Sequence, residues 1–127
     1  MPELDVARYA RHSRWSNPAA FAMHLDILPA APAALPEIVG GLMLHPLFAP
    51  AGSNTSEASL RKTTEILAAL LERDGQSLGQ PREAAKRVIG TCRNYALLAC
   101  AILRQHGIPA RSSASQRAWA MLVSWEA

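Results

Sequence analysis

Cys92 is the residue of this chain whose type and position best suit covalent chemistry. It stands in the stretch GTCRNYALLACAILRQHGIPAR, residues 90–111, two positions after a glycine and at the beginning of an apolar run. Cysteine attacks as the thiolate, and an ordinary thiol is mostly protonated at pH 7 unless positive charge lies beside it. A helix N-terminus supplies such charge through its unpaired N–H groups and its dipole, and Arg93 adds a guanidinium. Cys92 is therefore a candidate nucleophile.

A structural interpretation of Cys92 competes with the catalytic one. Cysteine is among the most often buried residue types, and spacing alone favours Cys92 as a core side chain like Cys100. The two cysteines are eight positions apart on one predicted helix, which separates them by about 12 Å. No disulfide is expected between them, since bridged Cα atoms lie within about 7 Å. The spacing also differs from that of a zinc pair, so neither a metal nor another cofactor is predicted.

The element that positions Cys92 is a predicted helix over residues 92–106. Its polar residues sit at the two ends, and a helix that is apolar nearly all round its middle is a buried one. Gly107 fits the left-handed position that ends a helix, and Ile108 and Pro109 follow as the usual hydrophobic contact and stop. Cys92 is therefore expected at the N-terminus of a buried helix.

Apolar residues at helical spacing predict three further helices, over residues 16–28, 31–46 and 57–74. The first is capped by Ser16 or Asn17, with Pro18 at the first helical position. Pro46 stops the second, and a loop over 48–57 precedes the third. A short turn of helix at Pro81 comes before Cys92. The predicted buried stripes are Phe21, Leu25 and Leu28, then Leu35, Ile38, Val39, Leu42 and Met43, then Leu60, Thr64, Leu67 and Leu71.

Length and composition indicate one globular domain with its own core, since the chain has 127 residues, 50% of them hydrophobic and 18% charged. No segment offers the roughly 20 apolar residues that a membrane helix needs, and no signal peptide is evident, so a cytoplasmic location is expected. The net charge is +3, but the basic residues are scattered among acids. Nucleic acid is therefore not expected as a partner.

The residues around Cys92 resemble the nucleophile segment of the transglutaminase-like superfamily. Members of that family carry Gly-x-Cys at the start of a buried helix, an aromatic residue three positions later, and a Leu-Arg-x-x-Gly-Ile-Pro-Ala-Arg ending. The stretch GGLMLHPLFA, residues 40–49, is similar to the helical lead-in of bacterial stand-alone members, so the resemblance covers most of the chain up to Arg111. The matching residues are Gly90, Cys92, Tyr95, Leu103, Arg104, Gly107, Ile108, Pro109, Ala110 and Arg111.

The resemblance implies a papain-like α+β fold in which the cysteine helix packs on an antiparallel sheet. It also implies a cysteine acyltransferase or peptidase that acts on a protein or peptide. The thiolate attacks a glutaminyl or peptide carbonyl, a histidine moves the proton, and an aspartate orients the histidine. An amine or water then takes the acyl group from the thioester on Cys92.

The chain departs from this family pattern after Arg111. The family's histidine and aspartate come from strands beyond the Ile-Pro-Ala-Arg turn, and the sixteen residues after Arg111 contain neither. His106 lies about 21 Å from Cys92 along the helix and is expected to bond the last carbonyls of that helix. Surface positions are expected for His12 and His24, a capping or core role for His45, and ordinary helix-end positions for Asp5, Asp26 and Asp74.

The fold expected for residues 1–127 is therefore mostly α, a single domain. Residues 1–111 form the N-terminal helical part of an α+β papain-like fold, and 112–127 form an atypical tail in which AWAMLVSW has the pattern of one strand. Most of the antiparallel sheet is missing from this arrangement. A face of the cysteine helix would then be exposed, which favours self-association.

Two explanations of the missing partners stay open. One is truncation or a reading-frame change just after Arg111, and the other is a noncatalytic helical protein-binding module in which Cys92 belongs to the core. Both predict that the chain as given is inactive.

Overall fold

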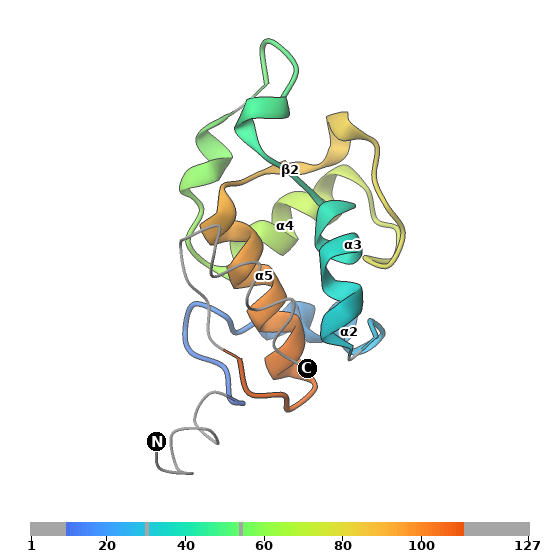
Figure 1. Ribbon diagram of the computed structural model, residues 1–127, viewed down its shortest axis with the longest axis vertical. Coiled ribbons are helices and arrows are strands. Elements are labelled where there is room, and N and C mark those ends of the chain that lie inside the picture. The colour runs from blue at the N-terminus through green and yellow to red at the C-terminus, as the bar shows by residue number, and fades with distance from the viewer. Residues whose placement is uncertain (1–9, 30, 54, 111–127) are drawn as a thin grey trace.

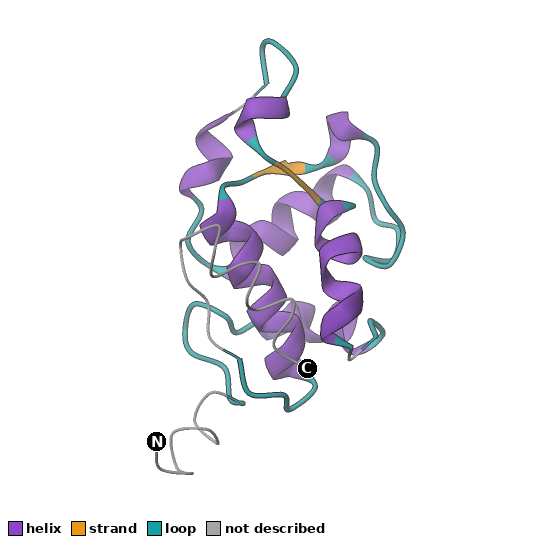
Figure 2. Cartoon of the chain, in the orientation of Figure 1, coloured by secondary structure: helices purple, strands orange, loops and turns teal. Residues whose placement is uncertain are grey.

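Helices make up most of the regular structure in the computed structural model, which describes residues 10–29, 31–53 and 55–110. Helix α5 is central, and α2, α3 and α4 pack against it (Figure 1). The α-helices are α2 (Ala22–Asp26), α3 (Leu35–Gly40), α4 (Thr63–Arg73) and α5 (Cys92–Gln105). The 3-10 turns are η1 (Ala19–Phe21), η2 (Pro32–Ala34), η3 (Pro46–Phe48), η4 (Thr55–Ser59) and η5 (Ala84–Lys86), and the strands are β1 (Met43–Leu44) and β2 (Val88–Ile89) (Figure 2).

Helix α5 is buried on all sides through its middle, as its apolar sequence predicts. Every residue from Ala96 to Leu103 is buried. The expectation that one face of this helix lies exposed is therefore not met within the described residues. The largest exposed fractions among their bulky apolar side chains belong instead to Met23, Ile27, Leu47 and Phe48. Self-association stays a prediction.

The end of α5 follows the predicted glycine pattern. The backbone at Gly107 is left-handed, with φ of 76°. The N–H of Ile108 donates to the carbonyl of Leu103 at 2.9 Å, and the N–H of Gly107 donates to that of Arg104 at 3.0 Å. These two bonds define a Schellman motif. The Arg104 side chain then donates from Nε to the carbonyl of Ala110 at 2.9 Å, which holds the departing chain against the helix.

The predicted second helix is shorter than its apolar spacing suggests. Helix α3 ends at Gly40, and Met43–Leu44 forms strand β1, which pairs in parallel with β2. At Gly41 an added Cβ would lie 3.1 Å from the Cα of Pro81, so glycine permits this close approach of two backbones. The Gly41 carbonyl also accepts from the N–H of Arg82 at 2.8 Å. Helical spacing was misleading here because Leu42 is buried from a turn and Met43 from strand β1.

The predicted third helix is divided into η4 and α4, with a break at residues 60–62. The break is stabilised by Glu65, whose Oε1 accepts from the N–H groups of Arg61 at 3.1 Å and Lys62 at 2.9 Å. Because α4 starts afresh after the break, its buried face differs from the predicted stripe. Leu67 is buried as expected, whereas Leu60 and Leu71 are only partly buried. The fully buried set of α4 is Thr63, Ile66, Leu67 and Leu70.

The first predicted helix is present as η1 followed by α2. The predicted cap is wrong, because Pro18 is the N-cap of η1 instead of its first residue and no side chain caps this helix. Asn17 Oδ1 accepts from the N–H of Ala19 at 2.9 Å, which forms a turn before η1. Leu25 and Leu28 are buried as predicted. The short turn expected at Pro81 begins later, as η5, and β2 follows it.

The described residues contain a parallel strand pair instead of the antiparallel sheet that the family resemblance implies. A buried side chain occupies the other edge of β2. Glu57, 8% exposed, accepts from the N–H of Ile89 at 3.1 Å and forms an ion pair with Arg73. Arg73 in turn donates to the carbonyl of Arg87 at 2.8 Å. The predicted strand AWAMLVSW lies outside the described residues.

No helix in the described part of the chain is long and apolar enough to cross a membrane.

Arg82 is a buried arginine that organises the loop between α4 and η5. It is 3% exposed, and its guanidinium donates to four backbone carbonyls at 2.7 to 3.0 Å. Its own carbonyl accepts from Nε of Arg87 at 2.8 Å. The carbonyls that it binds belong to Asp74, Gln76, Ser77 and Gln80. The Arg82 side chain thus supplies the hydrogen bonds that regular secondary structure would otherwise give to these backbone carbonyls.

Replacing Arg82 by methionine should destabilise the fold. The substitution leaves four carbonyls without their donor, and we expect a loss of about 2–4 kcal/mol in the free energy of unfolding. Urea denaturation followed by circular dichroism measures it. Lys86→Met is the matched control, because Lys86 is exposed. Equal unfolding midpoints for the two variants would show that the Arg82 bonds do not hold the loop.

Candidate active site

Cys92 is the first residue of α5, as the sequence predicts, and its side chain is partly exposed. Cys100, two turns further along, is buried. Neither cysteine is in a disulfide, and the Cys100 thiol donates to the carbonyl of Ala110 at 3.5 Å. The N–H groups of a first helical turn have no partner within the helix and carry the positive end of its dipole. Cys92 therefore combines access to solvent with a setting that favours an anion.

The first turn of α5 is fixed by Asn94, which is 1% exposed. Its Oδ1 accepts from the N–H of Thr91 at 3.0 Å and from the hydroxyl of Thr91 at 3.2 Å. Its Nδ2 donates to the carbonyl of Leu60 at 2.8 Å. The spacing Thr-x-x-Asn is a variant of the capping box, a signal in the sequence that could have identified Asn94. Asn94 therefore ties the start of α5 to the segment before α4.

Gly90 allows the turn from β2 into α5 to be very tight. An added Cβ at this position would lie 2.8 Å from the Cβ of Asn94 and 2.4 Å from the Cε of Met43. The first contact is with a rigid part of the helix, so it cannot be relieved by moving a flexible chain end. This gives a physical reason for the glycine two positions before Cys92.

The parallel strand pair brings the segment after β1 to the start of α5. Leu44 is in register with Ile89, so His45 and Gly90 leave the sheet at the same end. Tyr95, one turn after Cys92, forms a hydrogen bond with the backbone of His45. The His45 backbone and the candidate nucleophile thus both lie near the Tyr95 phenol.

The imidazole of His45 has a capping role, one of the two roles expected from the sequence. Its Nδ1 accepts from the N–H of Leu47 at 3.2 Å and caps η3. Because this bond uses the lone pair of Nδ1, the neutral ring carries its proton on Nε2. Only Nε2 of the ring is then left for another partner.

The other histidines of the chain lie away from Cys92. His12, expected at the surface, is instead half-buried and bonds Ser16 Oγ at 3.0 Å and Gln105 Oε1 at 2.9 Å, because the segment before η1 packs near the far end of α5. His106, expected to bond its own helix, instead contacts the carbonyl of Leu25 in α2 at 3.2 Å. His24 is half-buried beside Phe21. No described histidine is hydrogen-bonded to Cys92.

The described aspartates lie at helix ends, as expected, and have structural roles. Asp26 accepts from Nε2 of Gln105 at 2.7 Å, and Asp74 accepts from the N–H of Gln76 at 3.0 Å. Asp5 lies outside the described residues. Within the described ranges, no group of three or more His, Cys, Asp and Glu side chains is placed to hold a metal ion.

The phenol of Tyr95 is the titrating group whose environment is most clearly altered at this end of α5. Burial raises its pKa above the ordinary value of 10.0, the guanidinium of Arg87 lowers it in part, and the charge of Cys92 raises it. The hydroxyl of Tyr95 is therefore protonated at neutral pH and can donate a hydrogen bond there.

Replacing Gly90 by alanine should disturb the start of α5. The forced contact with Asn94 should cost about 1–3 kcal/mol in the free energy of unfolding, as overpacking does. Gly40→Ala is the matched control, since an added Cβ there meets nothing within 4 Å and alanine favours a helix. Chemical denaturation compares the two. A Gly90→Ala variant as stable as Gly40→Ala would contradict the close approach.

The raised pKa of Tyr95 should appear in the pH dependence of stability. Between pH 10 and the higher pKa of the folded state, the unfolded phenol has lost its proton and the folded one has kept it, so the free energy of unfolding falls as pH rises. The Tyr95→Phe variant should lose this part of the slope. The ultraviolet difference titration of wild type minus Tyr95→Phe should have a midpoint above the ordinary value of 10.0, and one at or below that value would contradict the burial.

A family model described as the transglutaminase-like superfamily matches residues 52–120 of the chain. The matched segment contains α4, β2, α5 and the Gly107 turn, and it extends beyond Arg111, where the resemblance noted in the sequence ends. No curated protein and no solved structure matches. Since the match covers more than half of the sequence, the chain belongs to the transglutaminase-like superfamily.

Proposed function

We propose that this chain carries the nucleophile of a cysteine acyltransferase or peptidase and that Cys92 forms the thioester. The observation that supports this most directly is the contrast between the two thiols. Cys92 is partly exposed at the N-terminus of α5, and Cys100 is buried in the same helix. Membership of the superfamily gives the class of chemistry. A papain-like arrangement, with α5 against an antiparallel sheet, is the corresponding proposal for the fold of the complete catalytic domain.

The proposed reaction begins when the thiolate of Cys92 attacks the carbonyl carbon of a glutaminyl or peptide amide. The C–S bond forms, and the π electrons of the carbonyl move to its oxygen. The N–H groups at the start of α5 that have no helical partner are the proposed donors to that charge. When the oxyanion collapses, the C–N bond breaks and the leaving nitrogen takes a proton. Attack by an amine or water on the thioester then releases Cys92.

Delivery of a proton to the leaving nitrogen is the weak step of this proposal, because no described histidine is hydrogen-bonded to Cys92 and the raised pKa of Tyr95 makes its phenol a weak acid. The ring of His45, which follows strand β1 as Gly90 follows β2, caps η3. We therefore propose that Cys92 is acylated readily only by substrates whose leaving group departs as an anion, and that the activity of the chain toward amides is low.

A protein or peptide is the proposed substrate, and the cytoplasm the proposed compartment. Two cysteines that are in no disulfide fit a reducing environment, where thiols persist.

An activated ester tests the nucleophile separately from the proton donor. p-Nitrophenyl acetate releases nitrophenolate, which leaves without a general acid, so the burst at pH 7 reports thiol attack alone. Wild type and Cys100→Ala should give a stoichiometric burst, and Cys92→Ala should give none. Mass spectrometry of the trapped adduct should place the acetyl group on Cys92. Attack should be about tenfold faster in the folded chain than in the urea-unfolded chain, because folding provides the helix terminus.

The opposite outcome favours a noncatalytic helical binding module with Cys92 as a packing residue. In that outcome the folded chain reacts with the ester no faster than the unfolded chain, and replacing Cys92 by alanine leaves this slow rate unchanged.

A further inference from the structure

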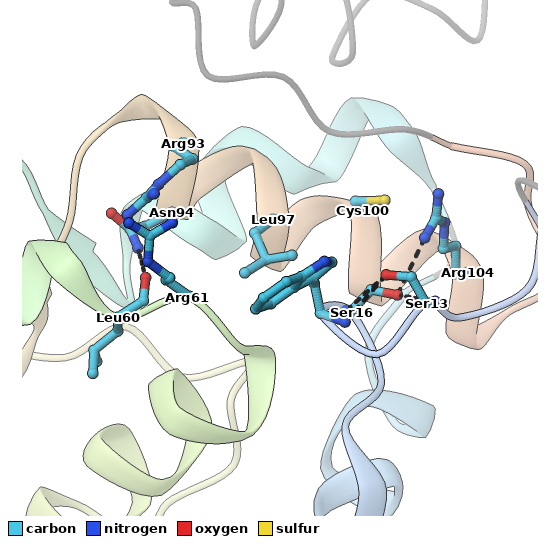
Figure 3. A pocket seen from close by; sticks show the side chains of 10 residues that line it. Ser13, Ser16, Leu60, Arg61, Arg93, Asn94, Leu97, Cys100 and Arg104 are labelled. Carbon is cyan, nitrogen blue, oxygen red and sulfur yellow. Dashed lines mark hydrogen bonds between the residues drawn. The ribbon is translucent and has the colours of Figure 1, made fainter.

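A pocket of about 310 Å³ along one face of α5 has a buried floor (Figure 3). Its described lining comes from α5, from the segment before η1 and from the segment between η4 and α4. Leu97 and Cys100, in the middle of the α5 face, are buried. A ligand in this pocket would therefore reach α5 only near the two ends of that face.

A second pocket, of about 250 Å³, lies over the strand pair. Leu44 and Ile89, which are paired in register, both line it. Successive side chains of a strand point to opposite faces, so Met43 and Val88 face the core instead. The walls come from η4, the end of α4 and η5, and the described lining is Leu44, Ser53, Glu57, Arg73, Ala84, Ala85, Arg87 and Ile89. We name this pocket the strand pocket.

The strand pocket is open to solvent on the side of η5. Ala84 and Ala85 are exposed, and Ser53 and Arg87 are half-buried. The Arg87 side chain is therefore accessible to a ligand that enters from this side.

Arg87 gives the strand pocket a positive charge. The carboxylate of Glu57 is already used within the fold, because it accepts from the N–H of Ile89 at 3.1 Å and pairs with Arg73. Arg87 donates from Nε to the neutral carbonyl of Arg82 at 2.8 Å. Within the described residues, its two terminal nitrogens have no hydrogen-bond or ion-pair partner. The Arg87 guanidinium is thus oriented by the fold and keeps donors for a ligand.

The strand pocket lies close to Cys92. Ile89 and Cys92 are three positions apart, so their Cα atoms are separated by no more than about 11 Å. Tyr95 connects the two sites, since the charges of Arg87 and Cys92 both act on the pKa of its phenol. An extended peptide covers about 11 Å with three or four residues. One peptide can therefore place one group at Arg87 and another at Cys92.

We propose that Arg87 in the strand pocket binds a carboxylate of the substrate peptide, within about four residues of the carbonyl that Cys92 attacks. A guanidinium suits this ligand because it can bind both oxygens of a carboxylate. The proposal rests on the proposed acyl transfer at Cys92 and adds to it a preference for acidic substrates.

Charged thiol reagents test for a carboxylate site beside Cys92. In the full chain with Cys100→Ala, Cys92 is the only cysteine. One reagent, 2-carboxyethyl methanethiosulfonate, carries a carboxylate, and methyl methanethiosulfonate is its neutral counterpart. Both react with the same thiolate, so any change in the pKa of the thiol cancels in the ratio of their rates. Arg87→Gln should lower the ratio of the carboxylate reagent to the neutral one about fivefold at low salt.

Lys86→Gln is the matched control for Arg87→Gln. It removes the same charge from an exposed neighbour outside the described lining, and it should change the ratio by less than about twofold. Arg87→Lys keeps the charge and should keep most of the ratio. The same ratio in Arg87→Gln as in the parent protein would overturn the proposal.

A carboxylate built into the strand pocket gives a second test. Arg87→Gln also removes the bond to Arg82, so its melting curve checks the fold. Ala84→Glu leaves that bond in place and should lower the ratio relative to Ala84→Gln, because the new side chain competes for Arg87 from an exposed position. A ratio that is the same in these two variants would contradict a carboxylate site in the strand pocket.

These ratios separate this proposal from the acyl transfer itself. Thiosulfonates react with any accessible thiol, so the ratios are measured even if p-nitrophenyl acetate gives no burst. A burst with no effect of Arg87→Gln on the ratio would overturn the carboxylate site alone.

Protection by peptides distinguishes an acidic side chain from a chain-terminal carboxylate. The probes are acetyl-Ala-Glu-Ala-amide and acetyl-Ala-Ala-Ala with a free carboxyl end, and the control is acetyl-Ala-Ala-Ala-amide. The favoured probe should slow the reaction of Cys92 with the neutral reagent, and Arg87→Gln should remove this protection. Protection by neither probe beyond that of the control would show that the pocket does not bind a substrate carboxylate.

Discussion

The complete burial of the middle of α5 is the constraint on which the rest of this structure depends. Every side chain from Ala96 to Leu103 is enclosed, so polar chemistry is confined to the two ends of the helix. At the N-terminal end, Cys92 is partly exposed to solvent and lies at the positive end of the helix dipole. The other end is closed by the Gly107 turn and by the bond from Arg104 to Ala110. Helices α2, α3 and α4 pack around α5, and their positions follow from the need to cover it.

Close backbone approaches and buried charges replace the extensive sheet that this chain lacks in its described part. Gly41 meets Pro81, and Gly90 meets Asn94, which lets two very short strands pair beside α5. Glu57 satisfies the free edge of β2, and Arg82 satisfies four carbonyls of an irregular loop. Burying such charged groups costs free energy, and removing one partner of a buried pair destabilises the fold. The geometry at Cys92 is therefore supported by residues far from it.

The proposed nucleophile stands apart from the histidines of the described residues. Cys92 lies at the N-terminus of α5 beside the protonated phenol of Tyr95. His12, His45 and His106 are hydrogen-bonded elsewhere.

The sequence by itself determined the features of this protein that depend on a few consecutive residues. The bounds of α5, its left-handed ending at Gly107 and the place of Cys92 at the helix start could all be predicted, because each follows from local hydrogen bonding and apolar spacing. The family resemblance around Cys92 was likewise contained in one continuous segment. The capping role of Asn94 was also local, although its signal was overlooked.

Only the tertiary structure decided the features that join distant parts of the chain. The strand at Met43–Leu44 has the apolar spacing of a helix and is extended because Gly41 meets Pro81 and β2 provides a partner. The break before α4, the bond from Ile89 to Glu57 and the burial of Arg82 likewise require segments that meet only after folding. The pocket along α5 belongs to the same class, because the described residues that line it come from three separate stretches of sequence. No local pattern can specify such contacts, since their stability comes from surfaces that the unfolded chain does not bring together.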